Sequence, residues 1–70
     1  MASEVRFADI RKKLEQHGWT HRQGKGSHHV FTRPGGPVIV IPVKGAWVKP
    51  VYVREVDAAI RSLEERQGLR

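Results

Sequence analysis

The sequence predicts an α+β fold with the element order α-β-β-β-α, in which two helices pack against a three-stranded antiparallel sheet. An apolar stripe with helical spacing stands near each end of the chain. Between the two stripes lie three short segments rich in β-branched and aromatic residues, separated by glycine and proline turns. Because each helix has a single apolar stripe, both helices are expected to cover one face of the sheet and to leave its other face open.

The first helix is expected to follow Ser3, whose hydroxyl suits the N-cap position. Its inner stripe consists of Phe7, Ile10 and Leu14, which recur at the spacing of helical turns. Gly18 is the candidate C-cap residue, because glycine adopts the left-handed backbone conformation that ends many helices. The helix is therefore expected between Ser3 and Gly18.

Three strands are expected over residues 19–23, 27–33 and 38–43. The third segment is a run of β-branched residues, which favour strands. Residues 24–26 form a glycine turn, and residues 34–37 form a breaker with the sequence Pro-Gly-Gly-Pro. Because these connections are short, the strands are expected to form an antiparallel meander.

Residues 44–52 are expected to be irregular, and a second helix is expected to start at Val53 and to end at Gly68. Its apolar stripe consists of Val53, Val56, Ile60 and Leu63. On another face of this helix, Asp57 stands four residues before Arg61, the order that favours an ion pair along a helix.

The length and charge of the chain limit the kind of site that it can carry. A chain of 70 residues forms a single domain, 1–70, which is too small for a deep enclosed pocket. A site is therefore expected in a groove or on an open surface, which suits a polymeric substrate. The net charge of +6 favours a polyanion such as a nucleic acid.

The composition also points to a compartment and an assembly state. Cysteine is absent, which excludes disulfides and thiolate metal sites. The N-terminus lacks the apolar stretch of a signal peptide, and the longest apolar run, 38–43, is too short to cross a bilayer. We therefore expect a cytoplasmic protein without membrane contact. Neither helix has a second apolar stripe, so we expect a monomer when the protein is free.

The adjacent His28 and His29 are the candidate chemical residues of the chain. Phe31 is the largest apolar residue of the second strand and is expected on the helix-covered face. Alternation along the strand then places His29 on that covered face and His28 on the open face. An imidazole accepts and donates protons near neutral pH, so His28 is a candidate proton-transfer residue. The alternative is that His28 is an exposed histidine with no functional role.

The other polar candidates surround this strand. Arg22, Lys25 and Lys44 are expected beside His28, where they could neutralise a phosphate. His17 and His21 stand near a helix C-terminus and are expected on the surface. Four histidines without an acidic cluster do not form a convincing ligand set, so neither a metal nor another cofactor is expected. Two aromatic residues in the loop before the second helix either stack on unpaired bases or close the end of the core, namely Trp47 and Tyr52.

Several motifs recur together in one known family. The first helix ends in Leu14-Glu15-Gln16-His17-Gly18-Trp19, and Gly26-Ser27-His28-His29-Val30-Phe31 follows. Ile41-Pro42-Val43 in the third strand and Gly68-Leu69 after the last helix complete the pattern. On these residues the chain resembles the HicA, or YcfA-like, toxins, which are small ribonucleases of bacterial and archaeal toxin–antitoxin pairs.

The resemblance implies a fold similar to the double-stranded RNA-binding domain and the activity of a metal-independent endoribonuclease that cleaves mRNA and inhibits translation. It implies that His28, the histidine of Gly-Ser-His, is the catalytic residue and that a HicB-type antitoxin covers the site. We expect the RNA-binding residues to be Arg22, Lys25, Ser27, His29 and Lys44. As a mechanism, neutral His28 would take the proton of a ribose 2′-hydroxyl, and His29 or Lys44 would protonate the leaving oxygen.

The chain departs from the family pattern at two places, and at one of them Val51-Tyr52 replaces the glycine that commonly precedes the last helix. Relatives often carry a histidine shortly after the proline of the third strand, whereas Val43-Lys44-Gly45 follows Pro42 here. Two alternatives therefore stay open, a non-catalytic RNA-binding module of the same fold and an attenuated toxin remnant that only pairs with its antitoxin. Residues 53–56 lack the lysine patch with which duplex-RNA binders begin their final helix, which counts against classical duplex binding.

Overall fold

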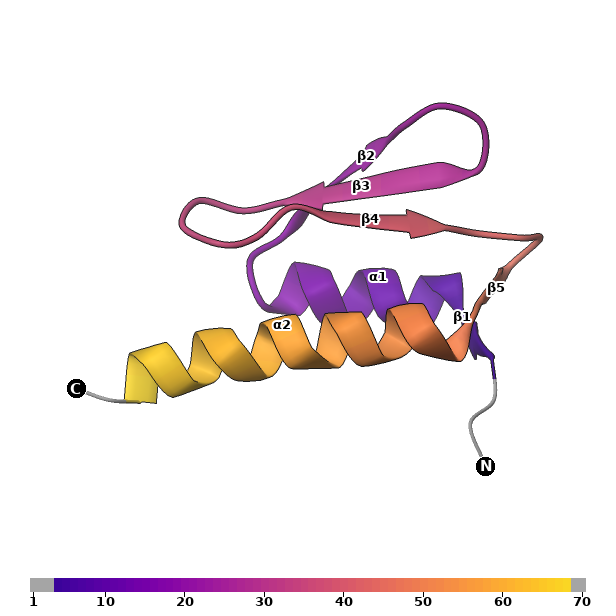
Figure 1. Ribbon diagram of the computed structural model, residues 1–70. Coiled ribbons are helices and arrows are strands. Elements are labelled where there is room, and N and C mark those ends of the chain that lie inside the picture. The colour runs from indigo at the N-terminus through magenta and orange to yellow at the C-terminus, as the bar shows by residue number, and fades with distance from the viewer. Residues whose placement is uncertain (1–3, 69–70) are drawn as a thin grey trace.

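The computed structural model describes residues 4–68, which form two helices and five strands (Figure 1). In chain order these are β1 (Val5–Arg6), α1 (Phe7–Gln16), β2 (Thr20–Gln23), β3 (His28–Thr32), β4 (Ile39–Pro42), β5 (Trp47–Val48) and α2 (Pro50–Gly68). The α+β class and the order of the main elements are confirmed, with two short strands added. Neither helix in this range is long and apolar enough to cross a membrane.

The main sheet is an antiparallel meander with β3 in its centre, in the order β2-β3-β4. The register places Phe31 opposite His21 of β2 and opposite Ile39 of β4. Both helices lie on one side of this sheet, and its other side is uncovered (Figure 1). The predicted two-layer arrangement is therefore confirmed.

The hydrophobic core lies between the sheet and the helices. Its buried side chains are Ile10, Leu14, Trp19, Phe31, Ile39, Ile41, Val43, Val48, Val56 and Ile60. Along β4 the burial alternates, since Ile39 and Ile41 are buried whereas Val40 is 45 % exposed. This period of two is the signature of a strand with one covered and one open face.

The C-terminus of α1 ends in a Schellman motif. The backbone N–H of Gly18 donates to the carbonyl of Glu15 at 3.1 Å, and that of Trp19 donates to the carbonyl of Leu14 at 3.0 Å. Gly18 has a φ of +97°, which glycine adopts without a steric penalty, and its predicted capping role is confirmed. The motif also brings the buried Leu14 and Trp19 together in the core.

The N-terminal part of the fold differs from the sequence prediction. The first helix begins at Phe7, with Arg6 in the N-cap position and no capping hydrogen bond from its side chain. Ser3, the expected cap, lies outside the described residues. Residues Val5–Arg6 instead form β1, which pairs with the Trp47–Val48 strand. This pairing satisfies backbone groups that a longer helix would have used internally.

The segment before the second helix also differs from its prediction as irregular chain. It contains β5, and α2 begins at Pro50 rather than at Val53. Proline suits the first position of a helix because its missing N–H would have no intrahelical partner there. The predicted apolar stripe is confirmed, since Val56 and Ile60 are buried and the stripe residues at either end are partly buried against the core.

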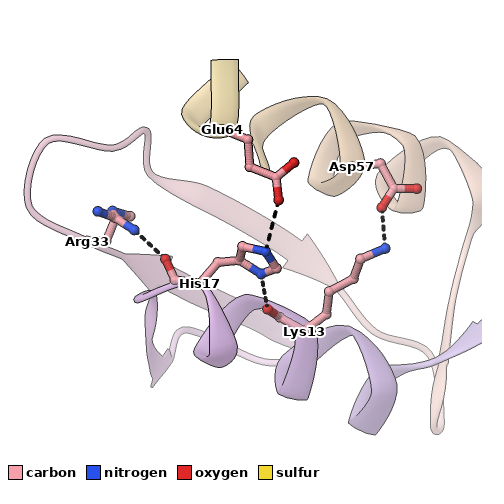
Figure 2. A network of polar contacts seen from close by, with 5 residues as sticks. All are labelled: Lys13, His17, Arg33, Asp57 and Glu64. Carbon is pink, nitrogen blue, oxygen red and sulfur yellow. Dashed lines mark hydrogen bonds and ion pairs between the residues drawn. The ribbon is translucent and has the colours of Figure 1, made fainter. Parts of the chain in front are cut away.

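The two helices are joined by an ion pair that the sequence pattern does not predict. Lys13 Nζ of α1 lies 2.6 Å from Asp57 Oδ1 of α2 (Figure 2). The expected pairing of Asp57 with Arg61 is therefore wrong, because the carboxylate reaches across to the neighbouring helix. Both side chains are more than two-fifths exposed, so solvent screening limits the pair to at most about 1 kcal/mol of stability.

A second cluster closes the end of the core where α1 meets the sheet. The ring of His17 donates from Nδ1 to the Lys13 carbonyl at 2.9 Å, and its Nε2 lies 3.5 Å from Glu64 Oε2 of α2 (Figure 2). The guanidinium of Arg33, which lies over the Trp19 ring, donates to the His17 carbonyl. His17 is therefore half-buried at a junction, and not a plain surface residue as expected.

The alternation along β4 predicts unequal effects of neighbouring substitutions. Ile41→Ala is expected to lower the free energy of unfolding by about 2–5 kcal/mol, because Ile41 is fully buried. Val40→Ala, the matched control on the open face, is expected to cost less than about 1 kcal/mol. Urea unfolding of both variants measures the difference, and equal losses would contradict the assignment of the two faces.

Candidate functional site

His28 stands at the first position of β3, directly after the turn that joins it to β2. The turn is closed by two backbone hydrogen bonds, from Gly24 N–H to the His28 carbonyl at 2.9 Å and from His28 N–H to the Lys25 carbonyl at 3.1 Å. Gly26 adopts a φ of +59° within it, a conformation that glycine supplies at little cost. The tight turn fixes the backbone of His28 at the rim of the sheet.

The side chain of His28 is exposed on the open face, as the alternation predicts. Its Nδ1 lies 3.2 Å from the Lys25 carbonyl oxygen. A carbonyl oxygen only accepts hydrogen bonds, so Nδ1 carries the proton and Nε2 of the neutral ring keeps its lone pair. The turn therefore selects a tautomer in which a free basic nitrogen is available to a substrate.

A groove of about 450 Å³ lies at the same end of the sheet. Ser27, which precedes His28, and Pro42, which is its cross-strand partner, both line the groove and place it beside the histidine. The remaining lining residues are Glu4, Val43, Lys44, Gly45, Trp47, Lys49 and Tyr52. The groove thus combines two lysines, two aromatic rings and one carboxylate.

A hairpin shapes the far wall of the groove. The backbones of Lys44 and Trp47 exchange two hydrogen bonds of 3.2 and 3.1 Å, and Gly45 has a φ of +65° in the turn between them. The Trp47 ring is 42 % exposed, and the Arg6 guanidinium lies over it, 5.0 Å from the ring centroid. The hairpin therefore holds a large aromatic surface at the edge of the groove.

Of the three basic residues predicted to lie beside His28, one lines the groove and two are exposed outside it. Lys44 lines the groove, and Lys25 is exposed in the turn next to His28. Arg22 is exposed on β2 opposite Val30, which follows His28 by two residues on the same face of the sheet. Lys49, which the sequence analysis did not single out, is a second lysine of the groove.

His29 lies on the opposite face of the sheet from His28. Its Nδ1 is 2.7 Å from Nε2 of His21, and its ring centroid is 4.3 Å from that of Phe7. The sequence-based placement of His29 toward the packed side is confirmed. The placement of His21 on the surface is wrong, because its ring packs between the helix and the sheet near Phe7 and Phe31.

Burial lowers the pKa of His21 below its ordinary value of 6.5. The positive charge of Arg11 and the neighbouring His29 lower the pKa further, whereas the carboxylate of Glu15 opposes the shift. In the hydrogen bond between His21 and His29, one ring nitrogen donates and the other accepts, so this bond is lost when both rings are positively charged.

Among the side chains described, no three metal-ligating groups come together.

The sequence alone does not predict this groove, because its lining residues come from four separate segments of the chain. One local signal was present: Gly45 precedes the β-forming pair Trp47-Val48, and Pro50 follows at a suitable helix start. These residues together indicate a short hairpin and an earlier helix. No sequence pattern around Glu4 predicts that this residue lies beside the hairpin and the start of the helix.

The architecture is compatible with the class of double-stranded-RNA-binding-domain-like folds, here with an exposed histidine at the end of the central strand. The family model of the HicA toxin of bacterial toxin–antitoxin systems matches residues 7–64. The chain therefore belongs to the HicA toxin family, which makes it the toxin of a toxin–antitoxin pair with an antitoxin as its partner. No curated protein and no solved structure matches the chain.

The environment of His21 predicts a loss of stability in acid. A lowered pKa in the folded state means that the unfolded chain binds the proton more readily, so stability falls as the pH drops through 6.5. His21→Gln removes this titration and is expected to flatten the loss between about pH 7.5 and about pH 5.5. Urea unfolding at the two pH values measures the change in the free energy of unfolding, and His28→Gln, at an exposed histidine, serves as the control. Equal pH slopes for His21→Gln and the unchanged protein would contradict the expectation.

Proposed function

We propose that this toxin is an endoribonuclease that cleaves mRNA and so inhibits translation, with His28 as its general base. The supporting observation is the hydrogen bond from His28 Nδ1 to the Lys25 carbonyl, which leaves Nε2 free on the open face beside a basic groove. A general base needs a positioned, unprotonated nitrogen that a substrate can reach. Membership in the HicA toxin family supports the same conclusion.

In the proposed reaction Nε2 of His28 accepts the proton of a ribose 2′-hydroxyl. The 2′-oxygen forms a bond to the adjacent phosphorus, and the bond from phosphorus to the 5′-oxygen breaks. The products are a 2′,3′-cyclic phosphate and a 5′-hydroxyl, whose proton comes from a general acid. Because the nucleophile is the 2′-hydroxyl, the reaction is restricted to RNA.

The lysines of the groove are suited to the charge that develops on the phosphoryl oxygens. Lys44 and Lys49 line the groove, Lys25 is exposed in the turn before His28, and Arg22 is exposed on β2 opposite Val30. Preorganised cations at such a site stabilise the transition state more than they would in free solution. Lys44 is the better of the two candidate acids, because His29 lies on the other face of the sheet, bonded to His21.

The antitoxin is proposed to act by covering the same open face. On this face Val40 stands opposite Val30, which shares a side of β3 with His28, and Val38 is exposed just before β4. A HicB-type partner that buries them would block access of RNA to Nε2. The free toxin is proposed to be a monomer that acts on mRNA in the cytoplasm.

Substitution of His28 tests the catalytic assignment. His28→Asn keeps an amide donor near the Lys25 carbonyl but lacks a basic nitrogen, so cleavage of single-stranded RNA in EDTA is expected to fall by at least about 100-fold. RNA binding is expected to stay within about threefold, because the basic side chains are unchanged. Gel assays of cleavage and of binding measure the two effects, with Arg61→Ala as a distant control. Full activity of His28→Asn would overturn the assignment, and binding without cleavage by the unchanged protein would favour a non-catalytic module.

The source of the nucleophile is tested with a modified substrate. A single 2′-deoxy substitution at a mapped cleavage position is expected to abolish cleavage there and to leave neighbouring positions unchanged. Mass spectrometry is expected to find a 2′,3′-cyclic phosphate on the product of the unmodified strand. Continued cleavage at the deoxy position would mean that water or another group attacks the phosphorus.

A further inference from the structure

The groove beside His28 contains aromatic and acidic side chains that the cleavage chemistry does not use. Trp47 and Tyr52 contribute rings, and Glu4 contributes a carboxylate. We propose that these residues form a nucleobase subsite that binds an unpaired guanine next to the scissile phosphate and thereby sets the sequence preference of cleavage. The inference rests on the proposed ribonuclease function and names the determinant of its specificity.

Trp47 has the properties of a stacking platform. Trp47 is a large aromatic residue left 42 % exposed, although its neighbour Val48 is fully buried. Its backbone is held by pairing with Arg6 of β1 and by the hydrogen bonds to Lys44, and the Arg6 guanidinium covers part of the ring. A ring fixed in this way stacks on a base with little loss of conformational entropy.

The groove also lies beside the backbone of His28, because its lining includes the preceding residue Ser27. Ser27 joins its wall to His28, and the backbone N–H of Val43 donates to the Ser27 carbonyl at 3.0 Å, which ties the two strand ends together. Lys44 and Lys49 also line the groove and place positive charge in it. In the proposed complex, a base in the groove directs its phosphate toward the rim on the His28 side, with the lysines of the groove beside it.

The carboxylate of Glu4 selects among the bases. A carboxylate only accepts hydrogen bonds, and it has two oxygens side by side. Guanine presents two adjacent donors, N1–H and the N2 amino group, whereas each other base places an acceptor next to its donor. Among the described side chains Glu4 has no ion-pair or hydrogen-bond partner, so its oxygens are available to a ligand. Guanine is therefore the base that matches this groove.

Cleavage of oligouridine strands with a single guanosine, inosine or adenosine tests this proposal. Cleavage next to guanosine is expected to exceed cleavage next to adenosine by about tenfold or more, with inosine, which lacks the N2 amino group, in between. Glu4→Gln is expected to abolish the difference between the guanosine rate and the adenosine rate. Glu55→Gln, an exposed acid on α2, is the matched control and is expected to keep the preference. Trp47→Leu is expected to slow cleavage of all three strands by about tenfold.

Binding separates failure of the subsite from failure of the ribonuclease function. The His28→Asn protein is titrated with the same strands, and guanosine is expected to bind about tenfold more tightly than adenosine, a difference that Glu4→Gln removes. If the guanosine strand binds more tightly in this way but the unchanged protein cleaves no RNA, the ribonuclease proposal is wrong and the guanine subsite is supported. Equal affinity for the strands, or a guanosine preference that survives Glu4→Gln, overturns the subsite whatever the cleavage results.

Discussion

Burial of the Phe31 side chain at the centre of the sheet is the constraint on which the rest of the structure depends. Phe31 is completely covered by the helix layer, and its cross-strand neighbours His21 and Ile39 share its face. Within residues 4–68 both helices lie on one face of the sheet (Figure 1). Since side chains alternate along a strand, the burial of Phe31 forces His29 inward and His28 outward. A one-residue slip of β3 would exchange the two histidines and bury the candidate base.

The same constraint explains why adjacent histidines have different chemical surroundings. His29 is bonded to His21 beside Phe7, in a partly desolvated layer that lowers the pKa of His21. His28 is solvated, and the only directional constraint described for its ring is the Lys25 carbonyl. That carbonyl also accepts the His28 backbone N–H, so a single turn residue orients both the main chain and the ring. The catalytic proposal thus follows from the geometry of one glycine-containing turn.

Local patterns in the sequence predict most of the layers but not the groove. The helical stripes, the alternation around Phe31 and the Gly18 cap are local signals, and the structure confirms each of them. The β1–β5 pair was missed because two-residue strands have no periodicity and exist only through a partner about 40 residues away in the chain. Asp57 was assigned the wrong partner because its cation lies on the other helix. His21 was misplaced because its burial depends on the register with Phe31, and the groove depends on contacts among four segments.

The tautomer of His28 tests the central claim most directly, because the proposed chemistry needs a neutral ring with its proton on Nδ1. Long-range proton–nitrogen correlation spectra of the ¹⁵N-labelled protein, recorded at a pH where the imidazoles are neutral, distinguish the two ring nitrogens of each histidine. The proposed mechanism predicts a protonated Nδ1 and an unprotonated, pyridine-like Nε2 for His28. A proton on Nε2 would contradict it, since the only basic nitrogen would then face the Lys25 carbonyl and be unable to reach a ribose hydroxyl.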